Sequence, residues 1–394
     1  MARKSRTVQA LNGLESEISP FLSVSGSQLS GNLNDLRTRK MKFYSLHISD
    51  IRQETPECVS IAFEVPKDLQ SEFQYRQGQH LTVRMQMNGE EVRRSYSLCS
   101  SPLEEGWRIA VKKVEGGVFS TFANEQLKKG DLLEVAAPDG RFFPENLDIK
   151  AGDHVVLFAA GSGITPVISI IKSLLVSNPD CQISLIYGNK NAASVIFLEE
   201  IEGLKNRYLG RFQVFHVLSR ARTDVDWQRG RIDQERLQLI FKKMPDLLEG
   251  NHYFICGPEE MLLSVRESLE KNGISKSNIH FELFGTGKVG EKKKAAVVSE
   301  NIVAQAEIRL DGLRFDVPIH GGEVVLDAAL AAGADLPFAC KGGVCCTCRA
   351  KLVEGEVDME VNYALDPEEV EAGFILTCQA TPKTKSLKID FDTK

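Results

Sequence analysis

Four of the nine cysteines fall within nine residues, in Cys340-Lys-Gly-Gly-Val-Cys345-Cys346-Thr-Cys348, and Cys378 follows further along the chain. The spacing of Cys340, Cys345, Cys348 and the distant Cys378 is that of plant-type [2Fe–2S] ligands. Each iron of such a cluster takes two thiolates, and the two glycines suit a loop whose N–H groups point at sulfur. The sequence therefore predicts a [2Fe–2S] centre held by these four cysteines.

Two alternatives exist for this cysteine group. A structural zinc site usually shows two paired Cys-x2-Cys clips, whereas this chain has one clip and a single distant cysteine. The neighbouring thiol of Cys346 could replace Cys345 as a ligand, but the spacing favours Cys345.

A flavin site is predicted by two motifs that follow one another in the first part of the chain. Arg94-Ser95-Tyr96-Ser97 offers a cation for a phosphate, an aromatic face for an isoalloxazine ring and a hydroxyl for its reactive nitrogen. Gly116-Gly117-Val-Phe-Ser120-Thr121 opens a helical stretch that ends near Lys128, and such a helix start is an anion site suited to a pyrophosphate. An ordinary hairpin turn and N-cap would use the same residues. Both motifs together favour a flavin, which we take to be FAD, with FMN as the alternative.

A nucleotide site is predicted where a strand pattern gives way to a helix. Gly161-Ser-Gly163-Ile-Thr165-Pro166 follows the apolar run His154–Ala160 and opens a helix, the context in which phosphates bind at a helix N-terminus. A proline in the first turn is tolerated there. Cys256-Gly257-Pro258 ends a later strand, at the carboxyl edge of the sheet where ligands bind.

The choice of coenzyme rests on the ends of two further strands. Tyr187-Gly188-Asn189-Lys190 has no acid of the kind that an NAD site places on the ribose. Ser219-Arg220-Ala-Arg222 offers a hydroxyl and two guanidinium groups suited to a 2′-phosphate. NADPH is favoured, with NADH as the alternative, and the arginines could also simply form a solvated surface turn.

Hydrophobic periodicity places these motifs on three kinds of domain. Short strand patterns up to Leu147 predict an antiparallel β-barrel, and strands alternating with helices after Asp153 predict an α/β domain with a parallel sheet. The predicted organisation, by residue number, is a disordered extension over 1–40, an FAD-binding β-barrel over 41–150, a nucleotide-binding domain over 151–284, a linker over 285–301 and a [2Fe–2S] domain over 302–394.

Composition excludes some classes of function. Hydrophobic residues make up 42% of the chain and no apolar run reaches the roughly 18–20 residues of a membrane span, so no membrane partner is expected. The net charge of −6 gives no support for nucleic-acid binding. From residue 302 onward there are 9 Lys/Arg against 16 Asp/Glu, and 39 against 38 in the rest. The acidic C-terminal part suggests docking onto a basic partner surface, with solubility as the alternative.

The motifs resemble known families. Leu326-Asp-Ala-Ala-Leu-Ala-Ala-Gly, followed by the cysteine loop, resembles a plant-type ferredoxin domain, which implies an α+β fold of the β-grasp type. The two preceding domains resemble the ferredoxin–NADP reductase superfamily. That resemblance implies that Arg94, Ser120 and Thr121 hold the flavin phosphates, that Tyr96 stacks on the ring, and that Ser97 lies at its reactive edge. It also implies that Cys256 lies beside the nicotinamide and that Phe284 lies against the flavin.

The order of the modules resembles the reductase components of multicomponent oxygenases. It predicts a cytoplasmic enzyme that passes electrons from NADPH through FAD and the [2Fe–2S] cluster to a separate oxygenase or hydroxylase component. Ser97 and Cys256 are its candidate catalytic residues. A reductase for another hydroxylase or for a desaturase has the same build. A protein of a different class, a metal-stabilised electron carrier or interaction module without nicotinamide turnover, is the remaining alternative.

Overall fold

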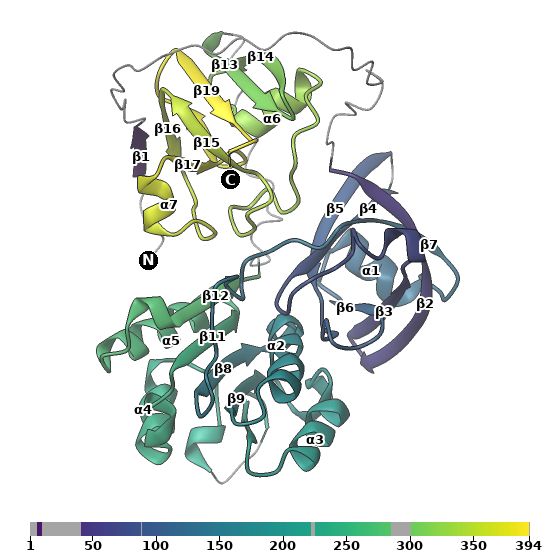
Figure 1. The fold of residues 1–394 in the computed structure, drawn as a ribbon, viewed down its shortest axis with the longest axis vertical. Helices are drawn as coiled ribbons and strands as arrows, with labels where there is room; N and C mark the ends of the chain where they lie inside the picture. The colour runs from purple at the N-terminus through teal and green to yellow at the C-terminus, as the bar shows by residue number, and fades with distance from the viewer. Residues whose placement is uncertain (1–5, 10–40, 88, 222–224, 285–300, 394) are drawn as a thin grey trace, which may run out of the picture. The chain divides into compact units, whose positions relative to one another are not determined.

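The structure, a computed structural model, describes residues 6–9, 41–87, 89–221, 225–284 and 301–393. Two compact units divide the chain: one spans Phe43–Lys292, and the other combines the N-terminal residues with Lys293–Lys394. The first unit contains a barrel and a parallel-sheet domain, and the second contains the cysteine loop (Figure 1). Among the described residues, no helix is both long and apolar enough to cross a membrane.

The barrel is a six-stranded antiparallel sheet. Its strands are β2 (Phe43–Thr55), β3 (Cys58–Glu64), β4 (His80–Met87), β5 (Glu90–Ser97), β6 (Trp107–Lys112) and β7 (Leu132–Ala136). The strand order is β5-β4-β7-β2-β3-β6, and a bridge between Leu98 and Ile109 closes the sheet from its first strand to its last. Successive residues of a strand point to opposite faces of the sheet. Side chains such as Leu46, Ile61 and Val83 point into the barrel and are therefore buried. Helix α1 (Val118–Glu125) packs against this core through Phe119.

The second domain of this unit is a parallel sheet with helices on both sides. The strands are β8 (His154–Ala160), β9 (Gln182–Asn189), β10 (Phe212–Leu218), β11 (His252–Gly257) and β12 (Ile279–Leu283), in the order β10-β9-β8-β11-β12. The helices are α2 (Ile164–Ser177), α3 (Leu198–Arg207), α4 (Gln234–Lys243) and α5 (Glu259–Lys271). In Figure 1, α2 and α3 lie on one side of the sheet and α4 and α5 on the other. The central strand β8 is buried along nearly its whole length, as a strand covered on both faces must be.

One helix of this domain starts later than its sequence pattern suggests. The pattern favours a helix from near Ser194, whereas α3 begins at Leu198. A capping box between Asn191 and Ser194 closes a short 3-10 turn first. Phe197 then adopts a left-handed φ of 61° before the α-helix begins. The chain therefore changes direction between the two helical segments.

The unit with the cysteine loop is a mixed sheet with a short helix, the α+β class expected from the resemblance to ferredoxins. Its elements are β13 (Ile302–Leu310), β14 (Leu313–His320), α6 (Val325–Ala331), β15 (Arg349–Glu354), α7 (Pro367–Glu371), β17 (Phe374–Leu376) and β19 (Ser386–Asp390). The strand order is β14-β13-β19-β15-β17, and β13 pairs with β19 in parallel. Buried residues such as Ile308, Leu326 and Leu376 form its core.

A second sheet of this unit contains the N-terminal strand β1 (Arg6–Gln9), which pairs antiparallel with β16 (Glu356–Met359), and β16 pairs with β18 (Ala380–Pro382). β1 falls within the predicted N-terminal extension. The other residues of 1–40, and residues 285–300 of the predicted linker, lie outside the described residues. The fold classes of the three domains are confirmed, and their boundaries stay predictions.

Candidate functional site

The predicted flavin strand is β5, which pairs with β4 so that Ser97 lies opposite His80 and Arg94 opposite Val83. Arg94 is exposed, and it shares a face of the strand with Tyr96 because residues two apart point the same way. The Tyr96 ring lies 5.6 Å from the ring of Phe119 in α1. The barrel therefore brings the two predicted flavin motifs next to each other.

The start of α1 is shaped by glycine. Gly116 has a φ of +70°, and a Cβ on Gly117 would lie 2.4 Å from the hydroxyl oxygen of Ser120. That hydroxyl accepts a hydrogen bond from the Val114 amide at 3.1 Å, while the Thr121 amide donates to the Gly117 carbonyl at 3.0 Å. A side chain at position 117 would displace Ser120, so this helix start needs a glycine.

Ser97 links the barrel to the parallel-sheet domain. Its buried hydroxyl donates a hydrogen bond of 3.1 Å to Oε2 of Glu282 in β12. Glu282 pairs in register with Cys256 of β11, so the hydroxyl, the carboxyl and the thiol come from three neighbouring strands. The two predicted catalytic residues, Ser97 and Cys256, are thus brought to one place.

Glu282 is a site residue that the sequence reasoning missed. Burial raises the pKa of its carboxyl to about 7, and the hydrogen bond from Ser97 only partly opposes that rise. Near neutral pH this carboxyl can therefore hold or release a proton at the Ser97 hydroxyl. The signal in the sequence was an acid inside the strand pattern Ile-His-Phe-Glu-Leu, two residues before Phe284. Cys256 differs, because burial raises the pKa of its thiol well above the usual value and keeps it protonated.

The predicted nucleotide loop and the Cys256-Gly257-Pro258 segment are in direct contact. A Cβ on Gly163 would lie 2.1 Å from the carbonyl oxygen of Cys256, so only glycine fits there. Gly257 has a φ of +157°, and a Cβ on it would lie 2.7 Å from the terminal methyl of Met261. The close approach places the start of α2 beside the end of β11, at the carboxyl edge of the sheet.

Two side-chain hydrogen bonds stabilise the nucleotide loop Gly161–Pro166. The buried Tyr187 hydroxyl donates to the Gly161 carbonyl at 3.0 Å, and the Thr165 hydroxyl donates to the Ser162 carbonyl at 3.0 Å. Pro166 lies in the first turn of α2, where its missing N–H removes no helical hydrogen bond. Pro258 is the N-cap residue of α5. The residues predicted to bind the nucleotide phosphates therefore frame two adjacent helix starts.

The residues predicted to choose the coenzyme lie apart from this loop. Ser219 and Arg220 are exposed at the end of β10, and β9 separates that strand from β8. The Ser219 and Arg220 amides donate to the carbonyls of Asn189 and Lys190 at 2.9 and 2.8 Å, which ties the turn to the end of β9. Arg222 lies outside the described residues. Phe284 follows β12 and is partly buried against the hydrophobic core.

The four predicted cluster cysteines converge in the other unit. The sulfur atoms of Cys340 and Cys345 are 3.1 Å apart. Hydrogen bonds from the Cys345 and Cys378 thiols lower the pKa of Cys340, and the Cys378 thiol does the same for Cys348. Cys346 points elsewhere, since its thiol donates to the Ala364 carbonyl at 3.2 Å.

Glycine also shapes the loop around these sulfur atoms. The Gly342 amide donates to the sulfur of Cys340 at 3.3 Å. Gly343 has a φ of +72°, and a Cβ on it would lie 2.7 Å from the Val361 carbonyl oxygen. The set of four thiols, with amide donors directed at sulfur, fits a [2Fe–2S] cluster. The barrel residues likewise fit FAD, because an exposed guanidinium, an aromatic ring and a glycine-led helix N-terminus lie on adjacent elements.

Three protein-family profiles match the chain in the same order as these sites. Residues 45–143 match the oxidoreductase FAD-binding domain, residues 157–267 the oxidoreductase NAD-binding domain, and residues 308–383 the 2Fe-2S iron-sulfur cluster binding domain. Each matched range contains the corresponding predicted motif. The cofactors FAD, a nicotinamide nucleotide and [2Fe–2S] are thereby confirmed.

Whole-length relatives have the same organisation. One of the subunits of the 1,2-phenylacetyl-CoA epoxidase of Escherichia coli K12 is 40% identical over 353 residues, which cover 89% of this chain and 98% of the relative. The ferredoxin reductase component of the 3-ketosteroid-9-alpha-monooxygenase of Rhodococcus rhodochrous is 36% identical, with 88% and 96% covered. The solved structure of phthalate dioxygenase reductase shares the fold, with a TM-score of 0.55, 23% identity, and 90% and 99% of the two chains covered.

Proposed function

Because the chain belongs to the family of oxygenase reductase components that combine FAD-binding, NAD-binding and 2Fe-2S domains, we propose that it delivers electrons from NADPH to a separate oxygenase. The chain is an oxidoreductase. When bound, FAD supplies acceptance of a hydride and its release as single electrons, and the cluster supplies one-electron transport. The residues of the chain bind and orient these groups.

The contact between Ser97 and Glu282 is the observation that supports this proposal most directly. It joins the flavin strand to the nucleotide domain at the register position of Cys256. A hydride donor bound at the carboxyl edge of the parallel sheet would therefore face the flavin strand. In the proposed arrangement, Arg94, Ser120 and Thr121 hold the flavin phosphates, Tyr96 covers the ring and Ser97 adjoins its reactive edge.

Rapid mixing of the full-length holoenzyme with NADPH, without oxygen, tests the electron route. Loss of the flavin absorbance should be followed by loss of the iron–sulfur absorbance in the same molecule. A flavin that bleaches while the iron stays oxidised would reject the route from flavin to cluster. A purified protein with no flavin and no iron–sulfur bands would favour the carrier or interaction module instead.

The preference for NADPH rests on Ser219 and Arg220 at the end of β10, and on the lack of an acid at the end of β9. Arg220→Ala should raise KM for NADPH by about tenfold or more, the usual scale for losing a charged hydrogen bond, and change KM for NADH little. Lys276→Ala, at the opposite edge of the same sheet, serves as the control because that exposed cation precedes β12. Equal effects of Arg220→Ala on both coenzymes would contradict the assignment.

The proposed acceptor is the oxygenase component of a phenylacetyl-CoA epoxidase, a choice supported by 40% identity over nearly the whole relative. Reconstitution with that oxygenase should give product, whereas a 3-ketosteroid-9-alpha-monooxygenase oxygenase should be served much less well. The opposite ranking would move the chain to another oxygenase system. None of the nine cysteines forms a disulfide, which suits a reducing compartment, and we propose the cytoplasm as the place of action.

A further inference from the structure

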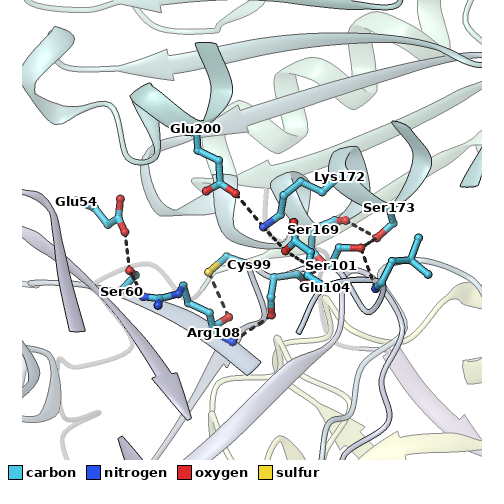
Figure 2. Close-up of polar contacts among 12 residues, drawn as sticks. Glu54, Ser60, Cys99, Ser101, Glu104, Arg108, Ser169, Lys172, Ser173 and Glu200 are labelled. Carbon is cyan, nitrogen blue, oxygen red and sulfur yellow. Dashed lines mark hydrogen bonds and ion pairs between the residues drawn. The ribbon is translucent and has the colours of Figure 1, made fainter. Parts of the chain in front are cut away.

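A buried lysine joins the barrel to the nucleotide domain. Lys172 lies in the middle of α2, and its side chain is only 9% exposed. Its Nζ lies 2.8 Å from Oε2 of Glu104, in the loop that follows the flavin strand, and 3.0 Å from Oε1 of Glu200, in the first turn of α3 (Figure 2). Glu104 belongs to the barrel and Glu200 to the nucleotide domain. The ion pair between Lys172 and Glu104 therefore connects the two domains.

Two further hydrogen bonds fasten the same segment to the same helix. The Ser169 hydroxyl donates to the Ser100 carbonyl at 2.7 Å. The hydroxyls of Ser101 and Ser173 lie 2.9 Å apart (Figure 2). Positions 169, 172 and 173 share one face of α2 because residues three and four apart are neighbours on a helix. We call these three contacts, between α2 and Ser100–Glu104, the interdomain clamp.

Along the chain, the interdomain clamp adjoins both predicted cofactor sites. The segment Ser100–Glu104 begins three residues after Ser97, and α2 begins directly after the nucleotide loop with Gly163. At 1.5 Å per residue, Lys172 lies about 10 Å along the helix from Thr165. A helix is stiff over two turns, so a shift at Lys172 moves the nucleotide loop with respect to the flavin strand.

At this position the ion pair of Lys172 with Glu104 connects the nucleotide domain to the barrel. The lysine lines a cavity of about 780 Å³ together with residues of both domains, among them Trp107 and Glu199. Burial alone would lower the pKa of Lys172, but Glu200 and Glu104 outweigh burial and raise it. The ammonium group therefore stays charged. Its two carboxylate partners hold it at the wall of the cavity, where apolar packing between the domains is incomplete.

We propose that Lys172 is a positioning residue that sets the separation between the bound nicotinamide and the flavin by clamping α2 to the chain that follows Ser97. The inference rests on the proposed function, because it takes the nucleotide at Gly161–Pro166 and the flavin at β5. It assigns no contact between Lys172 and either ligand. Its effect should therefore appear in the rate of hydride transfer rather than in the affinity for the nucleotide.

Lys172→Met in the full-length holoenzyme is the first test. The limiting rate of flavin reduction by NADPH should fall about ten- to a hundredfold, the scale expected for a misplacement near 1 Å, while Kd for NADPH stays within about threefold. Lys172→Arg keeps the charge and should restore most of the rate. Glu104→Gln weakens the ion pair between the two domains, whereas Glu200→Gln weakens the ion pair within the nucleotide domain. The first variant should therefore slow flavin reduction more than the second.

A structural readout and a matched control accompany the kinetics. Amide hydrogen exchange in the segment Leu98–Gly106 should become faster in Lys172→Met, because the clamp no longer holds it. Arg211→Met is the control, since Arg211 donates to the Asn178 and Leu175 carbonyls at the far end of α2 and stays within the nucleotide domain. It should leave both the limiting rate and the exchange of Leu98–Gly106 unchanged.

The outcomes separate the inference from the proposed function. A normal limiting rate in Lys172→Met, or the same loss in Arg211→Met, would overturn the positioning role while wild-type reduction by NADPH still supports the function. A wild-type flavin that no nicotinamide nucleotide reduces would reject both. If Lys172→Met loses FAD, two variants that change the same clamp from the barrel side, Glu104→Gln and Ser101→Ala, replace it. Their limiting rates of flavin reduction are then compared with that of Arg211→Met.

Discussion

At the scale of single residues, the site depends on how burial sets the protonation of a few groups. Ser97, Cys256 and Glu282 lie together, yet only the carboxyl has its pKa moved close to neutral pH. The Cys256 thiol is held protonated by the same burial. Any proton exchange among these three groups would therefore involve the carboxyl and the hydroxyl, while the thiol stays uncharged.

Glu282→Gln should stabilise the protein more at high pH than at low pH. The folded pKa of about 7 lies above the ordinary 4.5, so the folded state binds the proton more tightly and loses stability as pH rises between these values. At about 1.4 kcal/mol per pKa unit, the gain in unfolding free energy should be about 2 kcal/mol larger at pH 8 than at pH 5. Urea unfolding of both proteins at the two pH values measures it. The exposed Glu235→Gln is the control, and an equal gain at both pH values would contradict the prediction.

Cys345→Ser should abolish the iron–sulfur absorbance, whereas Cys346→Ser should keep it. The sulfur of Cys345 lies 3.1 Å from that of Cys340, while the thiol of Cys346 is engaged by the Ala364 carbonyl. Visible absorption and iron content of the two purified variants decide the matter. The reverse pattern would make Cys346 the ligand.

At the scale of elements, the regular strands and helices were predictable because their patterns are local. The apolar run His154–Ala160, which the sequence places before the nucleotide helix, coincides with strand β8. The late start of α3 was not predictable, because it depends on the left-handed Phe197. Glu282 and Lys172 were missed for a similar reason. Glu282 lies in β12 and Lys172 in α2, but their partners belong to other elements, which only the tertiary fold brings together.

His280→Phe should make the parallel sheet less sensitive to acid. Burial, and to a lesser extent the nearby His252, lower the pKa of His280 to about 4, and its ring lies 4.8 Å from that of Phe254 in β11. The unfolded state therefore binds the proton more readily, and stability is lost as pH falls from about 6.5 to 4.

At about 1.4 kcal/mol per pKa unit, the protonation of His280 should lower the unfolding free energy of the wild type by about 2 kcal/mol between pH 7 and pH 5. The phenylalanine variant should not show this loss. Urea unfolding at both pH values provides the measurement, with the exposed His47→Phe as its control. If His280→Phe loses as much stability as the wild type, His280 is not the acid-sensitive group.

At the scale of the whole molecule, charge is divided unequally between the parts of the chain. Residues 302–394 carry 9 Lys/Arg and 16 Asp/Glu, whereas the other residues are nearly balanced, at 39 and 38. An electron carrier of this charge attracts a basic acceptor over the range of a Debye length, which is about 10 Å at 0.1 M salt. On the proposed route, hydride transfer takes place within the unit Phe43–Lys292, so its limiting rate should not depend on salt in this way.

Raising the salt concentration should therefore weaken delivery to the oxygenase and leave the first step unchanged. Between about 50 and 300 mM NaCl, we expect KM for the oxygenase component to rise by about threefold or more. The limiting rate of flavin reduction by NADPH, measured in the same buffers, is the internal control. A KM that stays constant would mean that apolar contacts, and not charge, hold the two proteins together.

The strand order of the ferredoxin unit has a consequence for biosynthesis. Strand β19 occupies the middle of the sheet, between β13 and β15, although the ribosome makes it after every other strand of that sheet. At about 5–20 residues per second, β13 emerges several seconds before its central neighbour exists. The sheet can therefore close only after β19 has left the ribosome, because β19 is the strand that joins β13 to β15. A premature stop codon within Ser386–Asp390 would remove the strand that joins β13 to β15 and so divide the sheet in two.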